Sequence, residues 1–303
     1  MTDFTEFQQK IKTLLPEMEI RFWEPMHRHT SFRIGGNAEV MAFPKTVEEL
    51  SDVLKVSALL DCKPAILGAG TNVLAPDEGM GGMVICLKDC LDGMEQIGQT
   101  EIRCMAGVTM SRAAVFAANL GLEGLEFAHG IPGTIGGGLY MNAGAYGGEM
   151  SMVCTKAEVM DYTGNRRILS REELGFSYRN SAIQKQDLIV VAGWFSLKSG
   201  DKEAIWDQMR QLIARRTASQ PLNIPSAGSA FKRPSQGYAA ALIEGAGLKG
   251  FRVGNAAISD KHAGFAVNLG GATADDVKEL LCQVSQRVYQ QTGIQLEPEI
   301  RIW

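Results

Sequence analysis

The sequence has no apolar run long enough to cross a membrane. No stretch of its 303 residues approaches the roughly 18 to 20 consecutive apolar residues that a spanning helix needs. Met1–Phe4 contain neither a basic region nor an apolar core, so we expect no secretion signal and a cytoplasmic protein. Basic charge is not in excess either, and the net charge of −4 argues against a general nucleic-acid binder. A globular protein that binds neither membranes nor nucleic acid is therefore expected.

Cysteine pairs with metal-binding spacing are also absent. The cysteines are scattered in apolar surroundings without a CxxC pair, which favours buried structural thiols in a reducing compartment. His27 and His29 lie close in sequence, but no other metal-ligating residue stands near them. No metal site is expected. The six cysteines are Cys62, Cys86, Cys90, Cys104, Cys154 and Cys282.

Glycine is the residue in excess. The chain has 34 glycines, which cluster in 68–82, 121–148 and 245–271. Clustered glycine indicates backbone that comes close to something bulky. A chain of this length is long enough for two or three domains.

Hydrophobic spacing and capping residues predict a mixture of helices and strands, and thus an α+β protein. The capping residues are Thr46 and Thr273, each before a helix, and Ser170 before a short turn. Segment 217–225 has the composition of a hinge between domains. The terminal strand alternates, with Glu297, Glu299 and Arg301 on one face and Ile300 and Ile302 on the other. Helices are predicted near 4–15, 46–60, 109–119, 201–216, 239–246 and 273–291, and strands near 38–43, 64–67, 83–87, 101–106, 157–161, 166–169, 188–195, 256–259, 265–268 and 294–303.

The first glycine cluster follows the short apolar strand Pro64–Leu67 and reads Gly68-Ala69-Gly70-Thr71-Asn72. It is not a Rossmann fingerprint, because the third glycine of GxGxxG would fall on Val73. Successive N–H groups of such a turn can instead form a concave site for phosphate oxygens. The alternative is a loop that merely needs positive φ.

The second cluster is the densest, with five glycines in the nine residues 130–138, followed by Tyr140–Gly148. Its interleaved Ile, Pro, Leu and Tyr residues are unlike a polar flexible linker. We expect an ordered, largely buried loop whose backbone approaches a ligand, such as a dinucleotide. Tight structural packing without a ligand is the alternative.

Three polar side chains stand out elsewhere. Arg179 lies beside aromatic residues, Ser229 lies in a small-residue turn followed by Lys232 and Arg233, and Glu299 lies on the terminal strand. Such a serine can present a proton beside a negatively charged ligand. The alternatives are that Arg179 is a solvated surface residue, that Ser229 lies in an ordinary polar turn and that Glu299 lies on the solvent face of its strand.

Taken together, these segments resemble the UDP-N-acetylenolpyruvoylglucosamine reductase (UDP-N-acetylmuramate dehydrogenase) family. The resemblance covers nearly the whole chain and implies a vanillyl-alcohol-oxidase-like FAD-binding fold in two subdomains, 1–75 and 76–200, plus an α+β substrate-binding domain at 201–293. The terminal strand 294–303 is expected to return to the first subdomain. The segments that carry the resemblance are GAGTNVL at 68–74, GIPGTIGG at 130–137, YMNAGAYGG at 140–148, SYRNS at 177–181, AGSAFKRP at 227–234 and LEPEIR at 296–301.

The resemblance implies catalytic roles for Arg179, for Ser229 as proton donor and for Glu299. It also implies non-covalently bound FAD. The implied FAD contacts are Gly68, Ala69, Gly70, Thr71, Asn72, Pro132, Gly133, Thr134, Gly136, Gly137, Asn142, Ala143, Val190 and Arg301.

The sequence departs from the longer variant of the family. The interval from Tyr178 to Phe195 leaves no room for that variant's inserted substrate-closing segment, so the chain resembles the shorter variant. The longer variant's diphosphate-contacting lysine falls near Thr217. Arg can fork onto phosphate oxygens, and we expect the diphosphate contacts to be shared by Arg216, Arg233 and His262.

The implied reaction transfers a hydride from NADPH to FAD and then to the vinyl carbon of UDP-N-acetylglucosamine enolpyruvate. Arg179 would stabilise the resulting enolate, Glu299 would donate a hydrogen bond to it in the neutral form, and Ser229 would supply the proton. The alternatives are another flavin oxidoreductase of the same fold, a non-catalytic sugar-nucleotide-binding protein and, disfavoured by Val73, a nicotinamide-only dehydrogenase. The sequence favours no particular oligomeric state.

Overall fold

The computed structural model describes residues 5–303, which form two compact units. Met1–Phe4, on which the expectation about a secretion signal rests, lie outside the described residues. Among these residues, the first unit comprises 5–22, Glu39–Ala69 and Gly81–Ala214, and the second comprises Trp23–Ala38, Gly70–Met80 and Arg215–Trp303. Two short early segments thus belong to the same unit as the last third of the chain.

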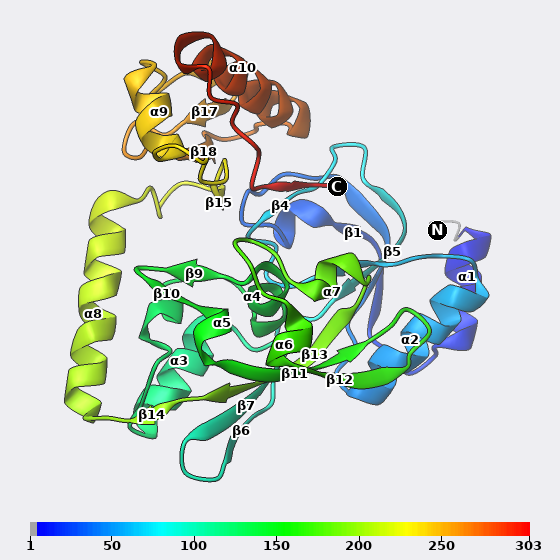
Figure 1. Ribbon diagram of the computed structural model, residues 1–303. Coiled ribbons are helices and arrows are strands. Elements are labelled where there is room, and N and C mark those ends of the chain that lie inside the picture. Colours follow the sequence, from blue (N-terminus) through cyan, green and yellow to red (C-terminus); the bar gives the residue numbers. More distant parts are fainter. Residues whose placement is uncertain (1–4) are drawn as a thin grey trace. The chain divides into compact units, whose positions relative to one another are not determined.

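The first unit contains most of the helices, two larger sheets and two two-stranded sheets (Figure 1). Strands β1 (Ile20–Pro25), β2 (Asn37–Ala42) and β5 (Met80–Cys86) and helix α8 (Lys202–Ser219) run across its boundaries. Its other elements are α1 (Glu6–Leu14), α2 (Val47–Leu59), β3 (Ala65–Leu67), β6 (Met94–Ile97), β7 (Glu101–Met105), α3 (Met110–Asn119), β8 (Leu122–Glu123), η2 (Glu126–Ala128), α4 (Ile135–Met141), β9 (Gly144–Ala145), β10 (Gly148–Glu149), α5 (Met150–Val153), β11 (Cys154–Met160), β12 (Arg166–Ser170), α6 (Arg171–Leu174), α7 (Ala182–Lys185), β13 (Ile189–Ser196) and β14 (Lys198–Ser199).

The larger sheet of the first unit has the antiparallel order β12-β11-β13-β7-β6, and a four-stranded sheet has the order β1-β2-β5-β3. Apolar residues of α2 and of both sheets join one buried core, in which Leu50, Ile85 and Phe195 are fully excluded from solvent. This burial is the main favourable contribution to the stability of the unit. Helix α4 packs on β13, where a Cβ on Gly193 would lie 2.7 Å from Cδ1 of Leu139.

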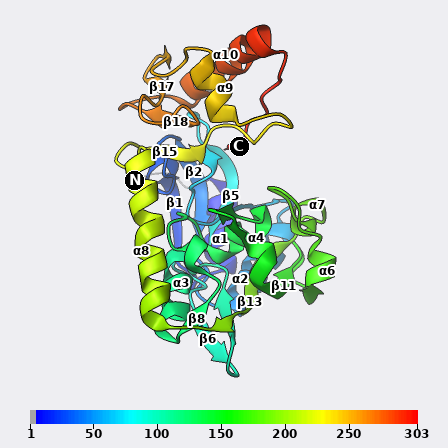
Figure 2. The same cartoon turned by 60° about the vertical axis from the view of Figure 1, so that its left-hand side comes forward.

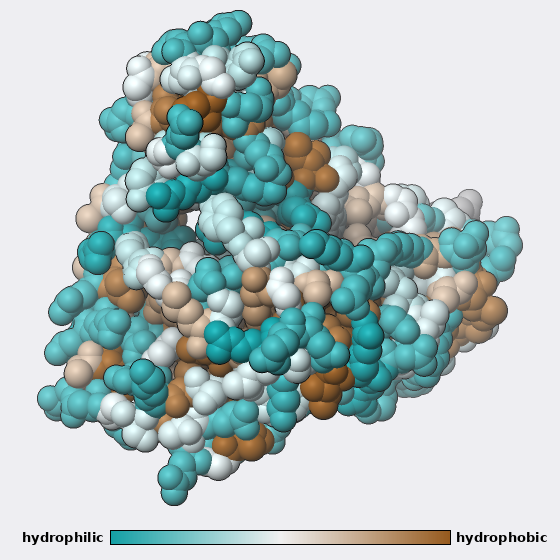
Figure 3. Space-filling view, in the orientation of Figure 1, coloured by the Kyte–Doolittle hydropathy of each residue, from teal (hydrophilic) through white to brown (hydrophobic). Residues whose placement is uncertain are grey.

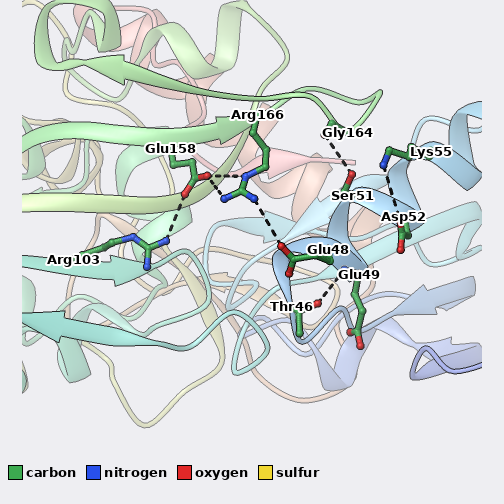
Figure 4. Close-up of polar contacts among 10 residues, drawn as sticks. All are labelled: Thr46, Glu48, Glu49, Ser51, Asp52, Lys55, Arg103, Glu158, Gly164 and Arg166. Carbon is green, nitrogen blue, oxygen red and sulfur yellow. Dashed lines mark hydrogen bonds and ion pairs between the residues drawn. The ribbon is translucent and has the colours of Figure 1, made fainter.

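A charged cluster lies on the larger sheet (Figure 4). Glu158 of β11, only 8% exposed, accepts hydrogen bonds from Nε of Arg166 at 2.7 Å and from Nη2 of Arg103 at 3.5 Å. Arg166 also lies 3.8 Å from the carboxylate of Glu48 on α2. The nearly buried carboxylate of Glu158 therefore links β7, β11 and β12, and Arg166 extends the cluster to α2.

The second unit is built on the antiparallel sheet β15-β18-β17-β16, against which α10 packs (Figures 1 and 2). Helix α9 contacts α10, and both contribute to the core of this unit. The last strand, β19, pairs in parallel with β4, with Arg301 opposite Val73. The elements are η1 (Met26–Arg28), β4 (Val73–Leu74), β15 (Ser226–Ser229), α9 (Ala239–Gly245), β16 (Arg252–Val253), β17 (Ala256–Ile258), β18 (Phe265–Asn268), α10 (Ala274–Thr292) and β19 (Arg301–Ile302).

Three predicted capping residues act as caps in the structure. Thr46 accepts a hydrogen bond from the N–H of Glu49 before α2, and Ser170 and Thr273 form complete capping boxes before α6 and α10. These predictions are confirmed because the capping signal is contained within four residues.

Three expectations are wrong in part. The glycine segment expected to be a loop ends in a helix, α4, which includes Gly136, Gly137 and Gly138. The terminal strand is reduced to β19, and Ile302 is 47% exposed although it was expected on the buried face. Cys282 is exposed rather than buried, because it lies on the outer side of α10.

The visible surface is mostly hydrophilic, with hydrophobic residues in separate small groups (Figure 3). Among residues 5–303, no helix combines the length and the hydropathy needed to cross a membrane.

Candidate functional site

In the first unit the two glycine clusters come together at Gly68 and Thr134. Gly68 follows β3, and Thr134 caps the N-terminus of α4. A Cβ on Gly68 would lie 2.6 Å from Oγ1 of Thr134, closer than real Cβ atoms come to another atom. A side chain at position 68 would therefore separate segments that lie 66 residues apart in sequence (134 − 68).

The N-terminus of α4 is held by the fold itself. The N–H of Ile135 donates to the carbonyl of Val108 at 2.8 Å, and that of Gly136 donates to the carbonyl of Ala106 at 2.9 Å. The N–H of Gly137 donates to Oγ1 of Thr134 at 3.3 Å. These bonds fix the position of α4 on the larger sheet.

The glycines of α4 differ in the space around them. A Cβ on Gly136 would lie 3.1 Å from Cβ and 3.2 Å from O of Ala106, whereas one on Gly137 would contact only Oγ1 of Thr134, at 3.7 Å. The absence of a side chain at Gly136 therefore allows α4 to pack closely against Ala106. Space beside Gly137 remains open.

The C-terminal end of α4 is closed by Asn142, which is 1% exposed and left-handed with φ 46°. Its Nδ2 donates to the carbonyl of Ser177 at 3.2 Å, and its Oδ1 accepts from the N–H of Ser151 at 2.9 Å. The N–H of Ala143 donates to the carbonyl of Gly138 at 2.8 Å. The side chain of Asn142 thus joins the end of α4 to the segment that precedes Arg179.

Arg179 lies in a tight turn. Ser177 and Asn180 exchange backbone hydrogen bonds of 3.0 and 3.1 Å, which leaves Tyr178 and Arg179 at the tip. Arg179 has φ 54°, a left-handed conformation uncommon for a residue with a side chain. Its guanidinium carbon lies 5.0 Å from the centre of the Tyr178 ring.

In the second unit, Ser229 and Glu299 lie on neighbouring segments. Ser229 ends β15 and pairs with Phe265 of β18. The next residue, Ala230, accepts a hydrogen bond from the N–H of Glu299 at 2.9 Å, and the N–H of Lys232 donates to the carbonyl of Glu297 at 2.8 Å. The serine turn and the end of the chain are therefore paired through their backbones.

The later part of the first glycine cluster joins them. Nδ2 of Asn72 donates to the carbonyl of Glu299 at 3.2 Å, and the N–H of Arg301 donates to the carbonyl of Asn72 at 3.0 Å. Gly70 has φ +62°, and a Cβ there would lie 2.0 Å from the carbonyl oxygen of His29. Asn72, Ser229 and Glu299 thus belong to one assembly of segments in the second unit, and Arg179 belongs to the first unit.

The three residues expected at the diphosphate all lie in the second unit. Nδ1 of His262 accepts from the N–H of Gly264 at 3.1 Å, and its ring contacts Phe265 edge-on at 5.1 Å. Burial lowers the pKa of His262, so its imidazole is neutral at neutral pH and its remaining N–H is on Nε2.

Arg233 and Arg216 lie in different local environments. The guanidinium of Arg233 lies 4.2 Å from the centre of the ring of Tyr238, an exposed residue that the sequence did not single out. Arg216 lies in the last part of α8. Among residues 5–303, no group of His, Cys, Asp and Glu could hold a metal ion.

Comparison with known proteins identifies the class first. Residues 38–170 match the FAD binding domain, and the fold resembles 6-hydroxy-D-nicotine oxidase from Arthrobacter nicotinovorans with a TM-score of 0.60 and 12% identity, over 94% of this chain and 89% of that chain. The protein therefore contains an FAD binding domain and has the vanillyl-alcohol-oxidase-like fold, of mixed α+β composition, as expected.

The more similar relatives then identify the family. Residues 220–303 match the C-terminal domain of UDP-N-acetylenolpyruvoylglucosamine reductase. The enzyme of that name from Caldanaerobacter subterraneus subsp. tengcongensis is 45% identical over 97% of this chain and 96% of its own length. The crystal structure of UDP-N-acetylenolpyruvylglucosamine reductase from Thermus caldophilus has a TM-score of 0.77 and 35% identity, over 95% and 99% of the two chains. The chain belongs to the UDP-N-acetylenolpyruvoylglucosamine reductase family, which confirms the resemblance.

Proposed function

We propose that this protein uses NADPH to reduce UDP-N-acetylglucosamine enolpyruvate to UDP-N-acetylmuramate through bound FAD, in the cytoplasmic synthesis of peptidoglycan precursors. The observation that carries the proposal is the 45% identity to a reductase of this name over nearly the full length of both chains. Identity at this level over 97% of this chain and 96% of that protein supports a common reaction rather than a common fold alone.

The residues around α4 fit a bound dinucleotide. The open space beside Gly137 leaves room for a large ligand, and the absence of a side chain at Gly68 lets the segment after β3 approach Thr134 closely. When bound, FAD supplies the chemistry of hydride transfer. We propose that it is held without a covalent bond by Gly68–Asn72, Pro132–Gly137, Asn142, Ala143, Val190 and Arg301.

We further propose the domain division expected from the sequence, with the FAD-binding subdomains at 1–75 and 76–200 and the substrate-binding domain at 201–293. The match of 38–170 to an FAD binding domain and of 220–303 to the reductase's C-terminal domain supports the order of these parts. The pairing of β19 with β4 supports the return of the terminal strand to a segment that precedes residue 75.

Arg179, Ser229 and Glu299 are proposed to act on the enolpyruvyl group. Reduction of the vinyl carbon places negative charge on the neighbouring carbon and its carboxylate. Arg179 offers a permanent cation with planar donors, and neutral Glu299 can donate a hydrogen bond to the enolate. Oγ–H of Ser229 supplies the proton. Serine is a weak acid, but the enolate carbon is strongly basic, so position matters more than acidity.

Arg216, Arg233 and His262 are proposed to share the substrate diphosphate. The two arginines supply charge, and Arg can place two donors on phosphate oxygens. His262 supplies a neutral donor through Nε2, because its Nδ1 is occupied by the N–H of Gly264.

The test is an anaerobic absorption experiment on the purified protein. We expect a yellow protein whose flavin is released on denaturation, is bleached by NADPH and regains its colour when the enolpyruvyl substrate is added. Flavin that stays on the denatured chain, or is reoxidised by oxygen but not by this substrate, would indicate an oxidase. A colourless protein that is indifferent to NADPH would indicate a sugar-nucleotide-binding protein.

A further inference from the structure

The turn that carries Arg179 is attached to the end of α4 by a side chain that the sequence did not single out. Gln184, a half-buried residue of the short helix α7, donates from its side-chain nitrogen to two carbonyl groups. One is the carbonyl of Arg179, at 3.2 Å, and the other is the carbonyl of Tyr140, at 2.7 Å. A single amide thus joins Arg179 itself to the last turn of α4.

Other hydrogen bonds reinforce this attachment. Oγ of Ser181 donates to the same carbonyl of Tyr140 at 2.9 Å, and Nδ2 of Asn142 donates to the carbonyl of Ser177 at 3.2 Å. The turn is therefore held on both flanks. Only Gln184 contacts the backbone of Arg179 in this set of bonds.

The tip of the turn needs such support. Arg179 is left-handed, with φ 54°, and a residue with a side chain keeps this conformation only where its surroundings impose it. A carbonyl held at a fixed point sets the orientation of the peptide and therefore the direction in which the Arg179 side chain leaves the backbone. The N–H of Asn180, which belongs to the same planar peptide as this carbonyl, fixes that peptide within the turn by donating to Ser177, and Gln184 fixes it relative to α4.

We propose that Gln184 is a positioning residue for the reduction of the enolpyruvyl substrate, because it fixes the carbonyl and hence the side-chain direction of Arg179 relative to α4. The inference rests on the role proposed above for Arg179. Glutamine suits the task because its amide carries two N–H groups and reaches both carbonyls, which an apolar side chain of the same length cannot do.

The test replaces Gln184 by methionine, which has a similar length and no donor. We expect Gln184→Met to bind FAD and to be bleached by NADPH at the wild-type rate. Reoxidation of the reduced flavin by the substrate should slow by roughly 10- to 100-fold, the loss typical of a misplaced catalytic group. Gln186→Met is the matched control, since Gln186 is exposed and its amide oxygen accepts from Arg167. It should leave both half-reactions unchanged.

A double-mutant cycle separates positioning from general damage. If Gln184 acts through Arg179, Gln184→Met should change the reoxidation rate less than about 2-fold in an Arg179→Ala background. An equal slowing in both backgrounds, or an equal slowing of both half-reactions, overturns the inference. If Gln184→Met loses flavin or thermal stability, Gln184→Glu replaces it, since that side chain keeps the size and removes the donors.

The same variants show whether the role proposed for Arg179 or only the role proposed for Gln184 is wrong. If Arg179→Ala reoxidises at the wild-type rate, the proposed role of Arg179 is wrong and the inference falls with it. If Arg179→Ala is slow and Gln184→Met is fast, the proposed function survives and only the role of Gln184 is excluded.

Discussion

The backbone N–H of Glu299 donates to the carbonyl of Ala230 at 2.9 Å, directly beside Ser229. Residues that are 70 positions apart (299 − 229) are thereby held on adjacent segments of the second unit. The bond uses backbone atoms only and does not involve the side chain of Ser229 or of Glu299. Either side chain can be replaced without removing this link, and the chemistry of each can be tested separately.

Ser229→Ala should separate the two half-reactions. Ser229 is exposed and its strand pairing uses the backbone, so the variant should fold and bind FAD normally. NADPH should bleach the flavin at the wild-type rate, whereas reoxidation by the enolpyruvyl substrate should slow by roughly 100- to 1,000-fold. Stopped-flow absorbance measures both rates. Ser235→Ala, in the exposed part of the same loop, is the control, and equal slowing of both half-reactions would exclude Ser229 as the proton donor.

Replacement of Gly136 or Gly137 of α4 by alanine should have opposite effects on stability. Gly137→Ala has space for its Cβ, and alanine favours a helix, so the apoprotein should gain about 0.5–1 kcal/mol. The same methyl group would occupy the space proposed for the cofactor, so FAD affinity should fall. Denaturant unfolding and flavin fluorescence titration measure the two effects.

Gly136→Ala is the matched comparison. Its Cβ would press on Ala106, a buried residue that follows β7, and should lower stability by about 1–3 kcal/mol. Unchanged FAD affinity in Gly137→Ala would show that the cofactor does not approach α4 on that side.

His262 should make the protein less stable in mild acid. Burial lowers its pKa in the folded state below the ordinary value of 6.5, so the unfolded chain takes up the proton more readily. Stability is complete above this ordinary value and is lost as the pH falls from it toward the lowered pKa. Protonation also removes the Nδ1 acceptor that the N–H of Gly264 uses.

Unfolding midpoints measured between about pH 7.5 and 5.5 check this dependence. His262→Asn, which does not titrate, should flatten the profile. Some dependence should remain, because burial also lowers the pKa of His129. His27→Asn, at an exposed position, is the control. A profile for His262→Asn that is as steep as that of the wild type would contradict the assignment.

Glu158 should contribute to stability far more than an exposed ion pair. Glu158→Ala removes the carboxylate between Arg103 and Arg166 and leaves two cations without it, so we expect a loss of about 2–3 kcal/mol in the free energy of unfolding. Asp207→Ala removes the exposed partner of Arg210 and should change the free energy of unfolding by less than about 0.5 kcal/mol. Equal effects in urea denaturation would show that the burial of Glu158 is unimportant.

Local signals in the sequence were sufficient for much of the fold and for the composition of the candidate site. Thr46, Ser170 and Thr273 are capping residues as predicted, since a cap and its partner lie within one helical turn. The glycine clusters and the segments around Arg179 and Ser229 could be recognised for a similar reason, because each is a short run of unusual residues that the chain displays without reference to its partners.

Contacts between distant segments decided the rest. Gly136 and Gly138 lack side chains where Ala106 and Met110, about 30 positions earlier, approach α4 too closely for larger residues, and no local pattern records that approach. The role proposed for Gln184 has the same origin. A glutamine in a four-residue helix has no periodic or capping signature, and it becomes significant only when folding brings the carbonyls of Arg179 and Tyr140 within reach of one amide.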